Sequence, residues 1–210
     1  MFSRSVNIKS DLNSQEFLSG YICPKSSEEA LVGLVKHVRG TGQGAFTWTG
    51  PYGAGKSSLV VLLSSMLAGN KALKETAYSR LSSDAQSITS EFIEPIKWRV
   101  LPVVGEPTDP LSVIGKAMVV NGFCDSPPAD SQELIATLQA AAEKKNGVVL
   151  FIDEMGKFLE ALSNGQSEAD IYLFQQLAEL ANSSDGKIIL IGVLHQSFNE
   201  YARNLSRVAR

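Results

Sequence analysis

The sequence has few cysteines, and their spacing does not fit a metal site. Only Cys23 and Cys124 occur in 210 residues, whereas the cysteine ligands of a metal site are closely spaced. Two cysteines so far apart in the chain favour a reducing compartment. We expect both to be small, partly buried side chains.

Long apolar segments and an excess of one charge are also missing. No apolar run reaches the roughly 20 residues of a membrane-spanning helix, and residues 1–6 lack the apolar core of a signal peptide. With 19 basic and 22 acidic side chains, the net charge is −3. No global basic field therefore argues for nucleic acid, although a local basic patch is compatible. We expect a cytoplasmic protein with no membrane contact.

The rest of the composition is that of an ordinary folded domain. Hydrophobic residues make up 44% of the chain and charged residues 20%, as in soluble globular proteins. A chain of 210 residues is long enough to form one domain with a substantial core. No internal repeat or low-complexity tract interrupts the sequence.

Residues 50–57 match the pattern G-x-x-x-x-G-K-[ST] of a phosphate-binding loop. The pattern is meaningful between a strand and a helix. Residues 45–49 can form a short buried strand, and residues 58–67 can form a helix. Glycines let the main chain approach phosphates, and successive N–H groups at a helix N-terminus form an anion-binding nest.

Lys56 and Ser57 supply the chemistry of this loop. Lys56 offers a mobile positive charge to the β- and γ-phosphates, and Ser57 offers a hydroxyl to magnesium. The alternative is a glycine-rich turn that binds nothing, and the presence of both side chains argues against it. The sequence thus predicts binding of a nucleoside triphosphate with Mg²⁺. The predicted binding residues are Gly50, Pro51, Tyr52, Gly53, Ala54, Gly55, Lys56, Ser57 and Ser58.

Apolar periodicity and turn residues predict alternating helices and strands along the rest of the chain. Further strands are predicted at residues 98–104, 148–152 and 188–194. Further helices are predicted from a capping box at 26–29 up to Gly40, and over residues 110–122, 131–145 and 167–182. Pro102 weakens the first of these strands or places it at a sheet edge. We expect residues 1–25 to be irregular and residues 70–96 to be an exposed excursion with some helix. This alternation predicts an α/β fold, with a parallel sheet between two layers of helices.

The unbroken apolar run at 148–152 predicts a strand buried on both faces, and it ends in Asp153 and Glu154. Ligands of open α/β sheets collect at the carboxyl ends of the strands, so both acids should face the crevice of Lys56 and Ser57. Asp153 is then placed to hold magnesium, usually through its water shell. Glu154 is placed to orient and polarise the water that attacks the γ-phosphate. The alternative is a solvated acidic pair that caps the next helix.

With these residues, the sequence resembles the P-loop ATPases that have an additional strand and a catalytic glutamate, the class containing the AAA+ proteins. Residues 44–58 resemble Walker A, residues 148–154 resemble Walker B, and residues 188–194 occupy the place of the sensor strand. The resemblance implies a P-loop NTPase fold of three αβα layers, with ATP and Mg²⁺ as cofactors. Residues 153–160 and 194–198 also resemble ATPase modules of large bacterial proteins, some of them in anti-phage defence.

In this class, a polar residue at the end of the sensor strand contacts the γ-phosphate or the attacking water. It is more often Asn, Thr or Ser, whereas here the position falls on His195 or Gln196. A polar residue that only closes the strand is the alternative. The resemblance thus implies four catalytic residues, namely Glu154, Lys56, Gln196 and His195.

The resemblance also implies contacts outside these motifs. Arg203, Arg207 and Arg210 would share one face of a helix, and in AAA+ relatives an arginine near this place reaches the γ-phosphate of a neighbouring subunit. This implies self-association or a larger assembly, while a basic solvated face or a nucleic-acid contact is the alternative for each arginine. Residues 21–22 lie where the family's N-terminal segment often packs on adenine, and ordinary packing is the alternative there.

The class continues after the sensor strand with a helix, a fifth core strand and usually a helical lid. This sequence stops at Arg210. We therefore expect the amino-terminal part of a larger ATPase, with a lead-in and flanking helix at residues 1–43 and the ATPase core at residues 44–210. The alternatives are an edge that is not needed or that another chain supplies.

These observations lead to one main function and two alternatives. The main expectation is an ATPase module that couples turnover to conformational change in a larger assembly, acting on a nucleic-acid or a protein client. A nucleotide-binding regulatory scaffold without turnover is the first alternative. A small-molecule kinase is the second, but it would need an acceptor pocket and an Arg-rich lid, and it has no use for a water-orienting glutamate.

Overall fold

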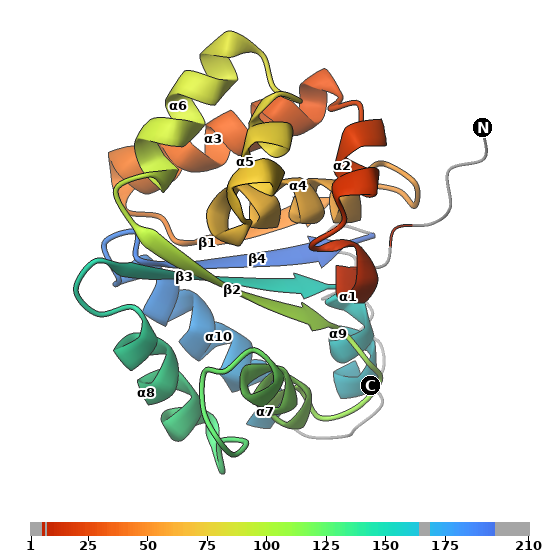
Figure 1. The fold of residues 1–210 in the computed structure, drawn as a ribbon. Coiled ribbons are helices and arrows are strands. Elements are labelled where there is room, and N and C mark those ends of the chain that lie inside the picture. Colours follow the sequence, from red (N-terminus) through yellow and green to blue (C-terminus); the bar gives the residue numbers. More distant parts are fainter. Residues whose placement is uncertain (1–5, 7, 164–168, 196–210) are drawn as a thin grey trace.

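In the part of the chain that the structure describes, a sheet of four parallel strands forms the middle layer, and helices cover both of its faces (Figure 1). The computed structural model describes residue 6, residues 8–163 and residues 169–195. Its strands, in the spatial order β1-β4-β3-β2, are β1 (Ala45–Thr49), β2 (Lys97–Val104), β3 (Asn146–Asp153) and β4 (Ile188–Leu194). The predicted α/β fold with a parallel sheet between helical layers is confirmed.

The two central strands are the ones that the sequence marks by unbroken apolar runs. All 7 residues of β4 are buried, as is all of β3 after its first residue. Helices cover both faces of these strands, so neither face needs the alternation of polar and apolar residues. The apolar runs therefore identify the centre of the sheet.

The outer strands, β1 and β2, differ from the central pair. Pro102 lies in β2, an edge strand of the described sheet, where a residue without an N–H group is tolerated. The prediction of a buried strand at 45–49 is wrong in one respect, because the side chains of β1 are half-buried or exposed. Among the described residues β1 pairs only with β4, so it is an edge strand as well.

The first helical layer lies above the sheet in Figure 1. Its helices are α2 (Gln15–Gly20), α3 (Lys25–Thr41), α4 (Lys56–Ala68), α5 (Lys71–Tyr78) and α6 (Ser83–Ile93). The short α1 (Ile8–Asp11) packs beside them on α4 and β2. All residues of α4 from Leu59 to Leu67 are buried, because this helix lies between the sheet and the rest of the layer.

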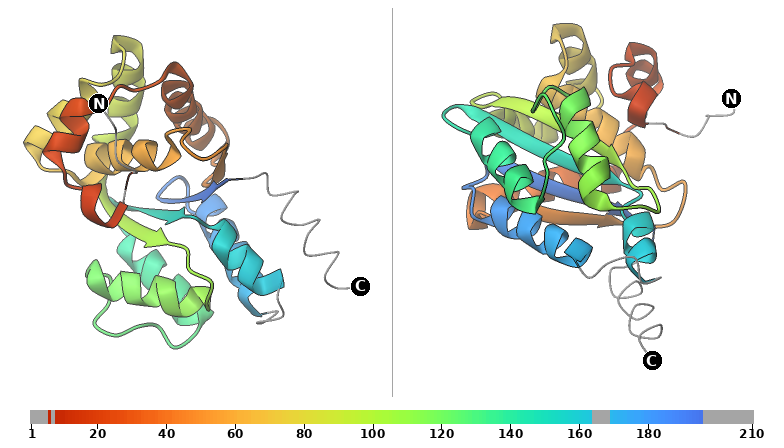
Figure 2. Two further views of the ribbon diagram at one scale, coloured as in Figure 1. Left: turned by 90° about the vertical axis from the view of Figure 1, so that its right-hand side faces the viewer. Right: turned by 90° about the horizontal axis from the view of Figure 1, so that it is seen from below.

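The second helical layer covers the opposite face of the sheet. Its helices are α7 (Pro110–Val120), α8 (Ser131–Ala141), α9 (Gly156–Ser163) and α10 (Ala169–Asn182). Figure 2 shows them from below, with α7, α8 and α10 spread across the sheet and α9 at one end. As predicted, α7 begins after Asp109, whose carboxylate accepts hydrogen bonds from the N–H groups of Leu111 and Ser112.

Two short helices replace the irregular segment predicted for residues 1–25. Within the described part of this segment, α1 has 4 residues and α2 has 6. The Ser14 hydroxyl caps α2 by accepting a hydrogen bond from the N–H of Phe17 at 3.1 Å. Helices this short show no apolar period in the sequence, so the prediction missed them.

The capping box predicted at residues 26–29 is wrong. Helix α3 begins one residue earlier, after Pro24, which provides no side-chain cap. Ser26 therefore lies inside the first turn and cannot be the N-cap. The Glu28 carboxylate accepts hydrogen bonds from the N–H and the hydroxyl of Ser82, both at 2.7 Å. Because Ser82 is the N-cap of α6, this contact joins the start of α3 to the start of α6.

Residues 70–96 contain two packed helices, so the predicted helix is present but the predicted exposure of this segment is wrong. Helices α5 and α6 bury Leu73, Ala77, Phe92 and Ile93 in the first core cluster. The many polar residues of this segment lie on the outer faces of two short helices, and this hides the apolar positions in the sequence.

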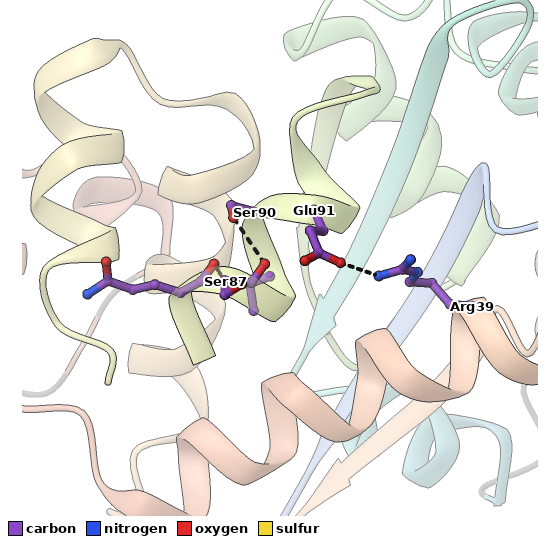
Figure 3. Close-up of polar contacts among 6 residues, drawn as sticks. Arg39, Ser87, Ser90 and Glu91 are labelled. Carbon is purple, nitrogen blue, oxygen red and sulfur yellow. Dashed lines mark hydrogen bonds and ion pairs between the residues drawn. The ribbon is translucent and has the colours of Figure 1, made fainter. Parts of the chain in front are cut away.

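An ion pair also connects α3 and α6, as Figure 3 shows. Arg39 donates a hydrogen bond to Glu91 at 3.0 Å, while the Ser90 hydroxyl donates to the Ser87 carbonyl within α6. Both side chains of the ion pair are more than half exposed, so the pair adds little to stability. Burial of apolar side chains is the main force that holds α6 on α3.

Two further differences concern the second layer. The helix predicted at 131–145 ends at Ala141, and the carbonyl of Lys145 already accepts a hydrogen bond from Lys97 at the start of β2. Helix α9 is not among the predicted helices, although the alternative for Asp153 and Glu154 assumed a helix after them. In the part of the chain that the structure describes, no helix combines the length and apolar character needed to cross a membrane.

Candidate functional site

The loop over residues 50–55 connects β1 to the N-terminus of α4, which is the strand–loop–helix setting that the sequence predicts. Gly53 and Gly55 have positive φ angles of 77° and 82°, a region that glycine adopts without steric cost. Gly55 is also the N-cap of α4, so the free N–H groups of the helix start face the loop. The backbone can therefore bind an anion.

A cavity of about 520 Å³ lies beside the loop. It is lined by residues 52–58 of the loop and α4, by Asp153 and Glu154 after β3, and by Val6 and His195. Three separate parts of the sequence that were predicted to act together thus meet at one place. Gly50 and Pro51 do not line the cavity, but their carbonyl groups accept hydrogen bonds from Lys56.

The Lys56 side chain folds back over its own loop. Its ammonium donates to the carbonyl oxygens of Gly50 at 2.6 Å and of Pro51 at 2.8 Å. Desolvation lowers the pKa of Lys56, although the negative charge of Asp153 acts in the opposite direction. The ammonium is therefore held at the cavity by neutral acceptors, which phosphate oxygens can replace with stronger, charge-assisted hydrogen bonds.

Ser57 and Asp153 form the central contact of the site. The Ser57 hydroxyl donates to Oδ2 of Asp153 at 3.0 Å. Asp153 is only 7% exposed, and this burial raises the pKa of its carboxyl group, despite the hydrogen bonds from Ser57 and the N–H of Glu154. A buried carboxylate beside a hydroxyl is an oxygen donor set that fits Mg²⁺. The alternative of a solvated acidic pair does not apply to Asp153.

Glu154 is held in an unusual backbone conformation. Its φ angle is 52°, in the left-handed region, which costs roughly 1–2 kcal/mol for a residue with a β-carbon. Its N–H donates to Oδ1 of Asp153 at 3.0 Å, and its carboxylate is paired with the ammonium of Lys157 in α9. Strain of this kind is concentrated at functional sites.

Gly105, which the sequence analysis missed, supports this turn from the end of β2. Its N–H donates to the carbonyl of Asp153 at 2.7 Å. A β-carbon at this position would lie 2.3 Å from the carbonyl oxygen of Glu154, so only glycine fits. A glycine directly after a predicted strand was the available signal, but it does not show which chain segment lies against it.

We predict that Gly105→Ala destabilises the protein and displaces Glu154. The added methyl group must push backbone apart, which we expect to lower the free energy of unfolding by about 2–3 kcal/mol. Gly33→Ala, inside α3, is the matched control because nothing lies within 4 Å of its added β-carbon; it should raise stability by about 0.5–1 kcal/mol. Denaturant unfolding of both variants tests this, and equal stability of Gly105→Ala and the unmodified chain would contradict it.

His195 lies at the end of β4 and stacks on Tyr52 of the loop. The ring centroids are 3.6 Å apart, with 22° between the ring planes. Both ring nitrogens of His195 are buried and have no hydrogen-bond partner among the described residues. Desolvation, followed by the positive charge of Lys56, lowers the pKa of the imidazole.

The remaining candidates are not at the cavity or lie outside the described residues. Tyr21 stacks on Phe17, and Ile22 is 86% exposed, so neither lines the cavity, whereas Val6 of the N-terminal segment does. Gln196 and the three arginines at 203, 207 and 210 lie outside the part of the chain that the structure describes.

Comparison with known proteins identifies a family and a similar fold. A family model described as an AAA domain matches residues 38–197. The fold is similar to that of the ORC2 protein of Aeropyrum pernix, solved as ADPNP–ADP complexes, with a TM-score of 0.51 and 17% sequence identity. The similarity covers 92% of this chain and 49% of that protein, so the chain spans about half the length of its structural relative. No curated protein matches the sequence significantly.

Proposed function

This chain belongs to the AAA domain family of nucleotide-binding proteins, and we propose that it binds ATP with Mg²⁺ and hydrolyses it. We propose further that turnover drives a conformational change in a larger assembly. The ORC2 protein was solved as ADPNP–ADP complexes, which supports an adenine nucleotide as the ligand of this chain.

The observation that carries this proposal is the hydrogen bond between Ser57 and Asp153. It joins two residues that are 96 positions apart in the sequence, and it places the end of β3 directly beside the phosphate-binding loop. A glycine-rich turn without a ligand would not need a buried carboxylate at this position, because a buried negative charge without a cation beside it is costly. A site that holds a cation together with phosphates explains both residues.

The loop and Lys56 would bind the phosphates. Backbone N–H groups at the start of α4 would donate to phosphate oxygens, and the Lys56 ammonium would exchange its two carbonyl acceptors for the β- and γ-phosphates. Ser57 and Asp153 would hold magnesium, which when bound supplies positive charge that offsets the charge of the phosphate oxygens.

Glu154 would act on the attacking water. Its carboxylate lies at the cavity and is 33% exposed, so a water molecule can reach it. The carboxylate would accept a hydrogen bond from that water and direct its oxygen at the γ-phosphorus. A bond then forms between the water oxygen and the γ-phosphorus, and the bond to the β–γ bridging oxygen breaks. One proton of the water passes to the Glu154 carboxylate, ADP leaves, and free phosphate is released.

Nucleotide titration combined with phosphate detection tests the proposal. The chain should bind ATP more tightly in Mg²⁺ than in EDTA, and it should release free phosphate. Binding without turnover would instead favour a regulatory scaffold, and transfer of phosphate to an acceptor would favour a small-molecule kinase. Absence of binding to any nucleoside triphosphate would contradict the proposal altogether.

The role of Asp153 leads to a second prediction. Mg²⁺ should raise the ATP affinity of the unmodified chain over its value in EDTA, and in Asp153→Asn this ratio of affinities should be about 10–100-fold smaller. Loss of a residue that supports a bound metal has effects of this size. Asp84→Asn, at an exposed position in α6, is the matched control. Titrations in Mg²⁺ and in EDTA separate the effects, and an unchanged Mg²⁺ dependence in Asp153→Asn would exclude it as part of the metal site.

We also propose a cytoplasmic location for the chain. Cys23 and Cys124 are both free cysteines, which supports a reducing compartment.

A further inference from the structure

The stacked pair of Tyr52 and His195 is not explained by phosphate binding alone. Tyr52 is one of the most exposed large hydrophobic side chains in the described chain, at 79%, yet one face of its ring covers the imidazole at a centroid distance of 3.6 Å. An exposed aromatic ring gains little from burial, so its position must depend on the ring that it covers.

The sheet fixes where the two rings meet. Strands β1 and β4 are parallel neighbours, and Thr49 is paired with Leu194 at their carboxyl ends. His195 is the residue directly after Leu194, and Tyr52 lies in the loop, three residues after Thr49. The phosphate-binding loop and the end of β4 are thereby held together, although they are far apart in the sequence.

The imidazole has hydrogen-bonding capacity that no described residue uses. Both of its nitrogens are buried and lack a partner among the described residues, and buried polar atoms without a partner are rare in native proteins. His195 lines the same cavity as Lys56 and Glu154. A ligand oxygen that enters this cavity beside His195 would satisfy a ring nitrogen.

We propose that Tyr52 is a positioning residue, whose ring holds the His195 imidazole so that one nitrogen faces the terminal phosphate. The pair thereby makes the site prefer ATP to ADP. This inference rests on the proposed function, since it needs a nucleoside triphosphate at the cavity. The role of the Tyr52 side chain is therefore separate from phosphate binding by the loop backbone.

The physical reason is rotamer restriction. The imidazole can turn about its side-chain bonds, and only some of its orientations direct a nitrogen into the cavity. Contact with a second aromatic ring favours one orientation by about threefold to tenfold. Removal of the Tyr52 ring should therefore reduce the preference for ATP over ADP by that factor. Removal of His195 should reduce it at least as much.

NMR of the histidine rings tests the contact without any nucleotide. The chain has 2 histidines, so His37 is an internal control for His195. The ring current of Tyr52 should shift the His195 ring protons upfield. Tyr52→Ala should remove this shift, Tyr52→Phe should retain it, and the His37 signals should stay in place if each variant is folded. An unchanged His195 spectrum in Tyr52→Ala would overturn the proposal.

Nucleotide titration in Mg²⁺ then tests the role of the pair. The ratio of the ADP and ATP dissociation constants should fall in Tyr52→Ala and recover in Tyr52→Phe. The double variant with His195→Ala should show no further fall beyond His195→Ala alone, because Tyr52 acts through the imidazole.

The outcomes separate this inference from the proposed function. If the effects of the two single variants add independently, or if Tyr52→Phe behaves like Tyr52→Ala, the positioning role is wrong while ATP binding stands. If the unmodified chain binds neither nucleotide, the proposed function fails, and the ATP preference assigned to the pair fails with it. The ring-current measurement still shows in that case whether Tyr52 holds the imidazole.

Discussion

Lys56→Ala is expected to weaken ATP binding at least about 100-fold. A hydrogen bond to a charged group contributes about 1.5–3 kcal/mol, and the ammonium has the reach to make two of them, because it already contacts two carbonyl oxygens beside the cavity. Loss of both corresponds to about 3–6 kcal/mol, or more than two orders of magnitude in the dissociation constant. Titration with a fluorescent ATP analogue measures this loss directly.

The stability of Lys56→Ala separates lost binding from lost folding. Desolvation already disfavours the charged form of Lys56 at this position, so its removal should leave the thermal midpoint nearly unchanged. Lys71→Ala is the matched control, since the Lys71 side chain is 91% exposed on α5, and it should bind ATP normally. ATP affinity of Lys56→Ala within threefold of the unmodified chain would contradict the assignment of the loop.

Glu154→Gln is expected to retain ATP binding and to lose turnover by about 10²–10⁴-fold, the range for removal of a general base. Glutamine has the same size and can occupy the same place, but its neutral amide polarises water poorly. The substitution also removes the negatively charged partner of Lys157, whose pKa is raised chiefly by its hydrogen bond to Glu154. Phosphate release under single-turnover conditions measures the effect.

The control for this variant is Glu143→Gln, at an exposed position after α8. It should hydrolyse ATP at the normal rate. If Glu154→Gln also hydrolysed ATP at the normal rate, Glu154 could not be the residue that orients the water. If Glu154→Gln lost ATP binding together with turnover, Glu154 would contribute to the affinity for the nucleotide rather than to the chemical step.

Local patterns were sufficient to predict the loop, the central strands and the two acids. The spacing of Gly55, Lys56 and Ser57 sets the chemistry within a few residues, and an apolar run buried on both faces is visible without knowledge of its neighbours. The rule that ligands collect at the carboxyl ends of strands then places Asp153 beside Ser57, and the hydrogen bond between them agrees with it.

The features that were missed depend on distant partners. Ser26 and Glu29 fit a local capping box in sequence, but α3 already begins at Lys25. The carboxylate of the neighbouring Glu28 binds Ser82, 54 residues away. Gly105 is required only because Glu154 lies against it. The stack of Tyr52 on His195 follows from the pairing of β1 with β4, and alternating strands and helices do not reveal that order. Tertiary contacts decide each of these cases.

The left-handed backbone at Glu154 has a consequence for how this domain would change through descent. Glycine would relieve the strain at this position, since it adopts positive φ angles freely. Mutation would therefore tend to replace the glutamate once a lineage no longer needs its carboxylate, because the substitution stabilises the fold. Among relatives of this chain, a glutamate at this position should mark domains under selection for turnover, and glycine should mark domains that only hold the nucleotide.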